Sequence, residues 1–285
     1  MIFGKHLSHF GKSIYWVVVN SNVGLTELCP SEIMTILIHF HQCDFKHFKG
    51  YYGHVQKHMR SEFPRLVSYE RFVVLKKRVG IALYVYLYQC LGDCTGISYI
   101  DSTKLAVCNN RRIHQHRVFD GLAQRGQTSM GWFYGFKLHL VINEYGEIIA
   151  FDLTPGNVHD THMLDQLDDT LFGKLFGDKG YLSNNKASNL AQQGIELVTA
   201  IRRNMKQLIM KLEDKILLHK RGIIESVNNL LKNWAQIEHS RHRSPDNFFV
   251  NLIAGLIAYC WKPEKPSVQI DAEENMLLNH TPRLA

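Results

Sequence analysis

Hydrophobic and polar positions follow two different periodicities along the chain, which divide it into zones. Residues 25–92 carry apolar side chains at helical spacing, and Ser31 and Ser68 stand where they could cap helices. Gly92 and Gly96 interrupt this pattern, and apolar runs bounded by glycine and asparagine follow. The first zone is therefore expected to form a small all-helical unit, and the second zone to form a sheet.

Five apolar runs in the second zone have the length and composition of strands. They cover residues 96–107, 132–142, 148–153, 175–178 and 195–201. The polar loop 143–146 ends in glycine and predicts a hairpin, and helices are expected over 160–171, capped by Asp160, and over 183–193, capped by Ser183. This order of elements predicts an α/β fold with a mixed five-stranded sheet flanked by helices, antiparallel at its start and joined by crossovers later.

The last part of the chain predicts further helices and a polar tail. Residues 222–234 form an amphipathic helical pattern. The apolar run 248–261 is too short for the roughly 20 residues that span a bilayer, so it predicts a buried core helix. The expected organisation is an unassigned extension (1–24), a helical domain (25–92), an α/β domain (93–262) and a polar tail (263–285).

The charge balance favours a polyanionic partner. Lys and Arg number 33 against 26 Asp and Glu, a formal net charge of +7. The stretch 201–244 holds ten Lys or Arg against four Asp or Glu, and a second basic cluster includes Arg111, Arg112, Arg117 and Arg125. Charge alone does not separate nucleic acid from a membrane surface, and a solvated face remains the alternative for both clusters.

Cysteine usage favours an intracellular protein. The six cysteines are scattered, with one close pair, Cys90 and Cys94. A zinc site would need a second suitably spaced pair, and none follows. We therefore expect free thiols in a reducing cytoplasm. The apolar run 14–19 is shorter than the core of a signal peptide, so no export is expected.

Three acidic residues occupy positions that call for an explanation. Asp101 lies within a predicted strand, where Asp is depleted, and Asp178 ends another strand. Sites of α/β folds gather at strand ends. Glu225 shares a helical face with Arg221 and Lys232, within about 40° of one another. Each also has an ordinary interpretation, with the Asp residues as caps and Glu225 in an exposed i,i+4 pair with Arg221.

Several ordered motifs, taken together, resemble one family. They are IDSTK at 100–104, GWFYGFKLH at 131–139, TPGN at 154–157, GDKGY at 177–181, IIE at 223–225 and EHSRHRSP at 238–245. In this order they resemble the DDE transposases of bacterial insertion sequences, closest to the insertion-sequence 982 group. The resemblance runs from about residue 25 to residue 266, and residues 1–24 match nothing in it.

The resemblance implies an RNase H-like catalytic domain in which Asp101, Asp178 and Glu225 hold two divalent ions, Mg²⁺ or Mn²⁺. Hard oxygen ligands suit these ions. Relatives carry a Tyr, Arg, Glu and Lys signature, and Leu218 stands here in place of the Tyr. The basic residues expected to bind DNA are Arg221, Lys232, Lys104, Lys137, Lys179, Arg111, Arg112, Arg241 and Arg243.

The implied partners are the terminal inverted repeats of an element and the target DNA, and a second copy of the chain, with no membrane involved. The expected location is the bacterial cytoplasm, on the nucleoid. Two other functions stay open: a nuclease that cleaves without joining strands, and an inactive DNA-binding remnant.

The helical unit is expected to recognise the terminal sequence through its Lys and Arg, and the alternative is that it only braces the sheet or forms a dimer contact. His159 and Asp160 are expected to form a turn and a helix cap, with a place beside the active site as the alternative.

Overall fold

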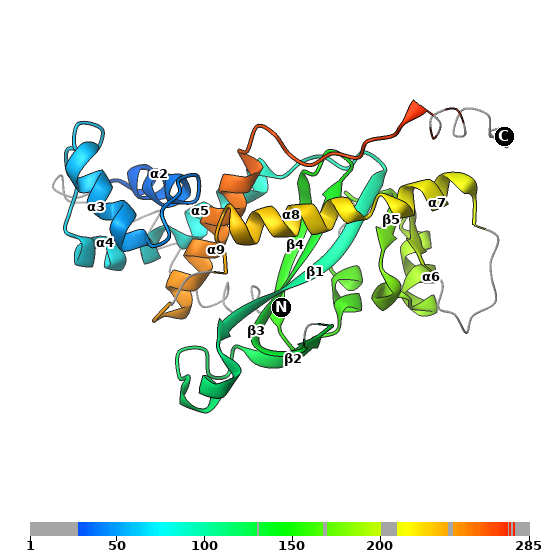
Figure 1. The fold of residues 1–285 in the computed structure, drawn as a ribbon, viewed down its shortest axis with the longest axis horizontal. Helices are drawn as coiled ribbons and strands as arrows, with labels where there is room; N and C mark the ends of the chain where they lie inside the picture. The colour runs from blue at the N-terminus through cyan, green and yellow to red at the C-terminus, as the bar shows by residue number, and fades with distance from the viewer. Residues whose placement is uncertain are drawn as a thin grey trace.

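The computed structural model describes residues 28–129, 131–167, 170–200, 210–238 and 242–272, with residues 274 and 276. Helices α2 to α4 lie at one end of the elongated molecule, the sheet occupies the middle, and α6 and α7 lie at the other end (Figure 1). The expected extension 1–24 lies outside the described residues.

The region ahead of the sheet is helical, as expected. Its elements are α2 (Pro30–Phe40), α3 (Phe48–His58), α4 (Tyr69–Leu75), the 3-10 turn η1 (Lys76–Val79) and α5 (Gly80–Cys90). Ser68 caps α4, because its hydroxyl accepts from Arg71 N at 3.2 Å. Ser31 does not cap α2, which begins one residue earlier at Pro30. Proline suits the first helical position, and Glu32 accepts from Cys29 N at 2.7 Å.

The sheet has six strands where the sequence predicted five. They are β1 (Ile97–Cys108), β2 (Gln124–Thr128), β3 (Gly131–Asn143), β4 (Ile148–Pro155), β5 (Gly173–Gly177) and β6 (Ile195–Thr199). β3 is antiparallel to β1 on one edge, and to both β2 and β4 on the other. β5 is parallel to β1 and β6 is parallel to β5. The antiparallel start and later crossovers are confirmed, and β2 is the strand that was missed.

Helices and 3-10 turns complete the fold. They are η2 (Asn110–Gln115), η3 (Asp160–Asp165), η4 (Lys179–Tyr181), α6 (Asn184–Gln192), α7 (Leu212–His219), α8 (Gly222–Asn233) and α9 (Pro245–Cys260). The helix expected over 160–171 is wrong, because only the 3-10 turn η3 forms there. His159 caps that turn through Thr161 N at 3.3 Å, while the Asp160 carboxylate is bonded to Lys137.

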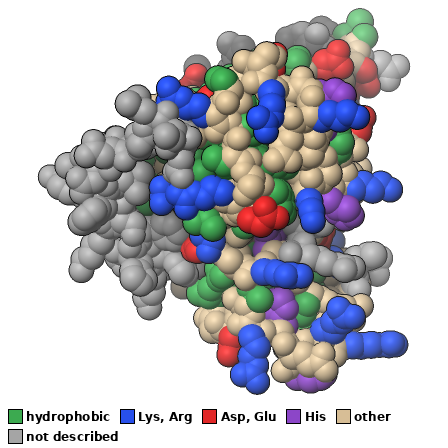
Figure 2. Space-filling model, turned by 90° about the vertical axis from the view of Figure 1, so that its left-hand side faces the viewer, with side chains coloured by type: hydrophobic (Ala, Val, Ile, Leu, Met, Phe, Trp, Pro, Cys, Tyr) green, Lys and Arg blue, Asp and Glu red, His purple; other side chains and the backbone are tan. Residues whose placement is uncertain are grey.

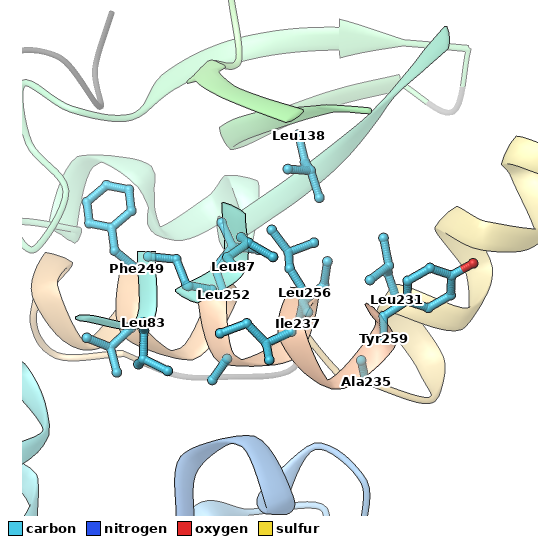
Figure 3. Close-up of a cluster of buried hydrophobic side chains, with 14 of the residues drawn as sticks. Leu83, Leu87, Leu138, Leu231, Ala235, Ile237, Phe249, Leu252, Leu256 and Tyr259 are labelled. Atoms are coloured by element: carbon cyan, nitrogen blue, oxygen red, sulfur yellow. The ribbon is translucent and has the colours of Figure 1, made fainter. Parts of the chain in front are cut away.

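The helical region and the sheet share one buried core. Leu83 and Leu87 of α5 lie in the same cluster as Leu252 and Leu256 of α9, and Leu138 of β3 belongs to it too (Figure 3). α9 is buried along nearly its whole length, which confirms the expected core helix. Among the described residues, no helix is both long and apolar enough to cross a membrane. The division into domains near residue 92 stays a prediction, and α5 belongs physically to the core that supports the sheet.

The first part of the tail lies against the sheet. Val268 N donates to Glu144 O at 2.8 Å, in the turn between β3 and β4. Gly146 in that turn has φ +71, and the Pro266 carbonyl approaches so closely that a Cβ would lie 2.1 Å from its oxygen. Only glycine meets both requirements at this position.

Candidate active site

Asp101 and Asp178 lie at the same level on neighbouring parallel strands. Tyr99 of β1 pairs with Phe176 of β5, and their rings stack with centroids 5.5 Å apart. Each Asp follows two residues later and therefore points to the same face as the ring before it. Asp178 comes directly after β5, and its Oδ1 accepts from Gly180 N at 2.7 Å. The strand register thus brings together two carboxylates that are 77 residues apart in the sequence.

Helix α8 packs on this face of β1 (Figure 1). Asn228 of α8 is buried, and its amide Nδ2 donates to Asp101 Oδ2 at 3.2 Å. Its Oδ1 is buried and has no hydrogen-bond partner among the described residues. Asn228 was not predicted from the sequence to lie at this site. The available signal was a polar residue on the apolar stripe of an amphipathic helix, one turn after Glu225.

Glu225 lies one turn before Asn228, but its side chain turns outward. The side chain is 62% exposed, and its Oε1 accepts from Arg221 Nη2 at 3.1 Å. This is the ordinary i,i+4 pair that the sequence left open as an alternative for Glu225. Glu225 is still near enough to act electrostatically on Asp101.

Asp101 carries a charge that its surroundings do not neutralise. Its pKa is raised to about 6, mainly by burial and also by the negative charges of Asp178 and Glu225, although a backbone hydrogen bond and Arg221 oppose the rise. A carboxylate with a raised pKa beside two others is an environment that favours a bound cation.

The three carboxylates do not converge on one point in this arrangement. Within the described ranges, no group of three His, Cys, Asp or Glu is placed to hold a metal ion. The reasons are visible in the hydrogen bonds, since Glu225 is turned to Arg221 and Asp178 to Gly180 N. The donor chemistry nevertheless fits, because all three side chains offer the hard oxygen ligands that Mg²⁺ and Mn²⁺ prefer.

A cationic cavity of about 480 Å³ opens beside Asp178. Lys179, Lys215, His219 and Arg221 line it together with Leu218. The expected DNA-contacting residues Lys179 and Arg221 thus lie next to the carboxylates. The sequence analysis singled out neither Lys215 nor His219 for the site, although their i,i+4 spacing in α7 places them on one face of that helix.

Two predicted DNA contacts belong to the other face of the sheet. Lys137 is buried, and its ammonium donates to Asp160 Oδ1 and to Val158 O, each at 2.9 Å. Lys104 lies directly opposite Lys137 in the register of β1 and β3. Since side chains alternate along β1, Lys104 points away from the face of Asp101. Asp160 holds the Lys137 ammonium inside the protein, and DNA binding by Lys137 stays a prediction.

The remaining predicted cations lie farther from the carboxylates. Lys232 is paired with Glu238 at 3.1 Å, and Glu238 also accepts from Ala106 N at 3.2 Å. Arg111 and Arg112 are exposed on η2, and Arg243 is exposed just ahead of α9. Arg241 lies outside the described residues, as does the basic stretch 201–209.

Comparison with known proteins agrees with this arrangement. The family described as the transposase DDE domain matches residues 91–245, more than half of the chain. That range contains Asp101 in β1, Asp178 directly after β5 and Glu225 in α8. The chain therefore belongs to the transposase DDE domain family. A search of curated proteins finds no matching sequence.

Proposed function

We propose that this transposase cleaves DNA at the ends of an insertion sequence and joins the freed 3′-hydroxyls to target DNA, with Asp101, Asp178 and Glu225 as its catalytic carboxylates. The observation that carries the proposal is the strand register, which sets Asp101 and Asp178 side by side beneath α8 inside the family's domain. The closest relationship proposed is to the insertion-sequence 982 group, on the motifs that the sequence shares with it.

The order of the strands supports an RNase H-like domain. β4, β3 and β1 are antiparallel neighbours, and β5 and β6 continue the sheet in parallel from β1. The first carboxylate then lies on the central strand and the second follows the adjacent parallel strand, while the third comes from a helix across the face. Three distant parts of the chain thereby supply ligands to one site.

Asp101, Asp178 and Glu225 would hold two Mg²⁺ or Mn²⁺ ions. These ions would activate a water or a 3′-hydroxyl of the DNA and stabilise the leaving oxygen in an in-line displacement. Asn228 fixes the Asp101 carboxylate through its amide. To reach the same point, Glu225 must leave Arg221, which then becomes available to a phosphate oxygen in the cavity beside Asp178. Lys179 and Lys215 line the same cavity as further phosphate contacts.

The helical end of the molecule is proposed to read the terminal repeats. Figure 2 looks onto this end, and Lys and Arg side chains are spread across it with few acidic side chains among them. The exposed basic residues there are Lys46, Lys49, Lys57, Arg60, Arg65, Arg71, Lys77 and Arg78. Lys76 is an exception to the expectation, because it is buried over the Phe48 ring at 5.3 Å and cannot reach a phosphate.

A change of surface charge tests this role better than a truncation. Removal of residues 1–92 would strip α5 from α9 and expose the shared core. Replacing exposed Lys57 and Arg60 together by Gln should instead weaken protection of terminal-repeat DNA in a footprint and leave the fold intact. Unchanged protection would assign recognition to another surface.

The catalytic proposal is tested by cleavage of a duplex that carries the element end. Asp101→Asn, Asp178→Asn and Glu225→Gln should each abolish Mg²⁺-dependent cleavage while leaving DNA binding nearly unchanged. Asp165→Asn is the matched control, since Asp165 is half exposed and pairs only with Lys186 on the far side of the sheet. Wild-type cleavage by any one of the three variants would remove that residue from the site. Products joined to a second duplex separate a transposase from a nuclease that does not join strands.

A further inference from the structure

A large aromatic side chain stands in solvent on the β2–β3 hairpin. Trp132 is 62% exposed, in a part of the sheet whose next apolar residue, Phe133, is buried. Trp132 pairs with Gln127, and Tyr134 pairs with Arg125 two positions along. Because side chains two apart share a face, Trp132, Tyr134 and Arg125 lie on the same side of the hairpin. Arg125 therefore lies diagonally across the hairpin from the exposed indole, on the same face.

An open cavity of about 530 Å³ adjoins this face. Its wall includes Tyr134 and Arg125 from the hairpin, and His114, His116 and Arg117 from the connection between β1 and β2. In Figure 1 this connection projects from the sheet on the side of β2 and β3. The volume falls within the range of small-ligand sites, roughly 300 to 1,000 Å³, so the space can take a group as large as a nucleotide.

The charges around the cavity are predominantly positive and available. Arg111, Arg112, Arg117 and Arg125 are all exposed, and within the described ranges none of them forms an ion pair. Asp120 is the acidic residue on the wall. The wall also has a rigid aromatic component, since the His116 ring stacks on Phe119 with centroids 5.6 Å apart and planes 13° from parallel. Cations fixed beside aromatic faces are the combination that binds single nucleic-acid strands.

We propose that this surface binds an unpaired nucleotide of the DNA, with Trp132 stacked on its base and Arg117 and Arg125 on the flanking phosphates. The inference rests on the proposed DNA-binding function and extends it, because phosphate contacts alone would not need an exposed indole. Tyr134 lies opposite Cys108, seven residues along β1 from Asp101. At about 3.3 Å per residue the two sites are roughly 20 Å apart, so the nucleotide bound here is not the one that is cut.

The test is a binding measurement in EDTA, so that it does not depend on the carboxylate site. The probes are a labelled duplex with one unpaired nucleotide and the fully paired duplex of the same sequence. Wild-type protein should bind the first probe about tenfold more tightly, as expected for one base stacked on an aromatic ring. Trp132→Ala should remove this preference, and Trp132→Phe should retain part of it. Trp261→Ala is the matched control, because Trp261 is also exposed (57%) but lies at the end of α9.

Two outcomes would overturn the proposal. If Trp132→Ala keeps the wild-type preference, the indole does not hold the base. If the wild type binds both probes equally and Trp132→Ala weakens both equally, Trp132 contacts the intact duplex instead. If the wild-type protein prefers the duplex with the unpaired nucleotide but shows no metal-dependent cleavage, only the catalytic proposal is rejected. Normal cleavage without the preference would reject only the nucleotide site.

Discussion

Each face of β1 has a half-buried carboxylate beside it, Asp101 on one face and Asp160 on the other, and the pKa values of the two are shifted in opposite directions. On the face under α8, burial and two further carboxylates together raise the pKa of Asp101 to about 6. On the other face, burial also acts to raise the pKa of Asp160, but hydrogen bonds from Lys137 and Ser102 outweigh it and hold the pKa below its usual value. The Asp160 carboxylate forms an ion pair with Lys137, whereas among the described residues the Asp101 carboxylate forms no ion pair.

This difference separates a charge that is neutralised within the fold from one that is proposed to bind a cation. Lys137 and Ser102 reach Asp160 at 2.9 and 2.7 Å, and the set joins β1, β3 and the segment that begins η3. Asp101 has the amide of Asn228 at 3.2 Å, which is a neutral donor. A neutral donor orients a carboxylate without removing its charge, so the Asp101 face is suited to an exchangeable cation.

The comparison predicts its largest effect on the Asp160 face. Asp160→Ala leaves the Lys137 ammonium buried without its partner and should lower the free energy of unfolding by about 3 kcal/mol. Urea denaturation measures the change. Asp165→Ala, in the same 3-10 turn, breaks a more exposed pair and should cost less than about 1 kcal/mol. Equal losses in the two variants would show that Asp160 is no more structural than a surface residue.

The next effect concerns pH on the same face. Burial lowers the pKa of His139 to about 4, although Asp160 and Asp152 oppose the shift. The unfolded chain therefore binds a proton that the folded protein does not, and stability falls as pH drops from about 6.5 towards 4. By pH 5, His139 should account for about 2 kcal/mol of that loss.

His139→Gln isolates this contribution, because Gln does not titrate in this range. The buried His41 and His242, with pKa values lowered by burial to about 4 and about 3, act in the same direction in both proteins. Denaturation midpoints between pH 7.5 and 5 should therefore fall less steeply in the variant. Parallel curves would mean that the pKa of His139 is the same in the folded and unfolded states.

On the Asp101 face the sign of the stability change should reverse. Asp101→Asn removes a poorly neutralised buried charge, so in EDTA at pH 7 it should raise the free energy of unfolding by about 1 to 2 kcal/mol. Mg²⁺ should then stabilise the wild type in thermal unfolding and leave the variant unaffected. Destabilisation in EDTA would show that Asp101 is satisfied within the fold, as Asp160 is.

The smallest effect distinguishes the two cations of α8. Arg221 lies beside the carboxylates, whereas Lys232 is bound by Glu238. With Ca²⁺ present to occupy carboxylate ligands, Arg221→Ala should reduce the slope of log affinity against log salt by about one, and Lys232→Ala by less. DNA titrations at several salt concentrations measure both slopes. A full unit lost in Lys232→Ala would place DNA over that end of α8.

Most of the sheet could be predicted from the sequence because its strands are apolar runs bounded by glycine. β2 was missed because its five residues, Gln124–Thr128, are mostly polar and exposed, as suits a short strand on the outer edge of β3. The helix expected after Asp160 does not form, because the Asp160 side chain accepts a hydrogen bond from Lys137 and does not act as a cap. His159 caps a single 3-10 turn instead. Local capping rules could not reveal this long-range contact.

The candidate site could be predicted only in part. Asp101 stood out because Asp is depleted within strands, and Asp178 because it follows a strand end, where sites of α/β folds gather; the fold places them side by side. The burial of Lys137 was not predicted, because charge in a motif says nothing about which face of a strand it occupies. Asn228 needed the packing of α8 on β1 before its contact with Asp101 could be seen. Lys215 and His219 likewise join the site only through the approach of α7 to β5.

Asp101 is expected to bind a divalent cation, whereas Asp160 is already neutralised by Lys137. The most direct measurement is Mn²⁺ binding to the free protein, followed by the paramagnetic resonance of unbound Mn²⁺. Wild type and Asp165→Asn should bind with equal affinity, and Asp101→Asn should bind at least about tenfold more weakly, because a ligand carboxylate is lost. Binding by Asp101→Asn equal to that of wild type would contradict the account.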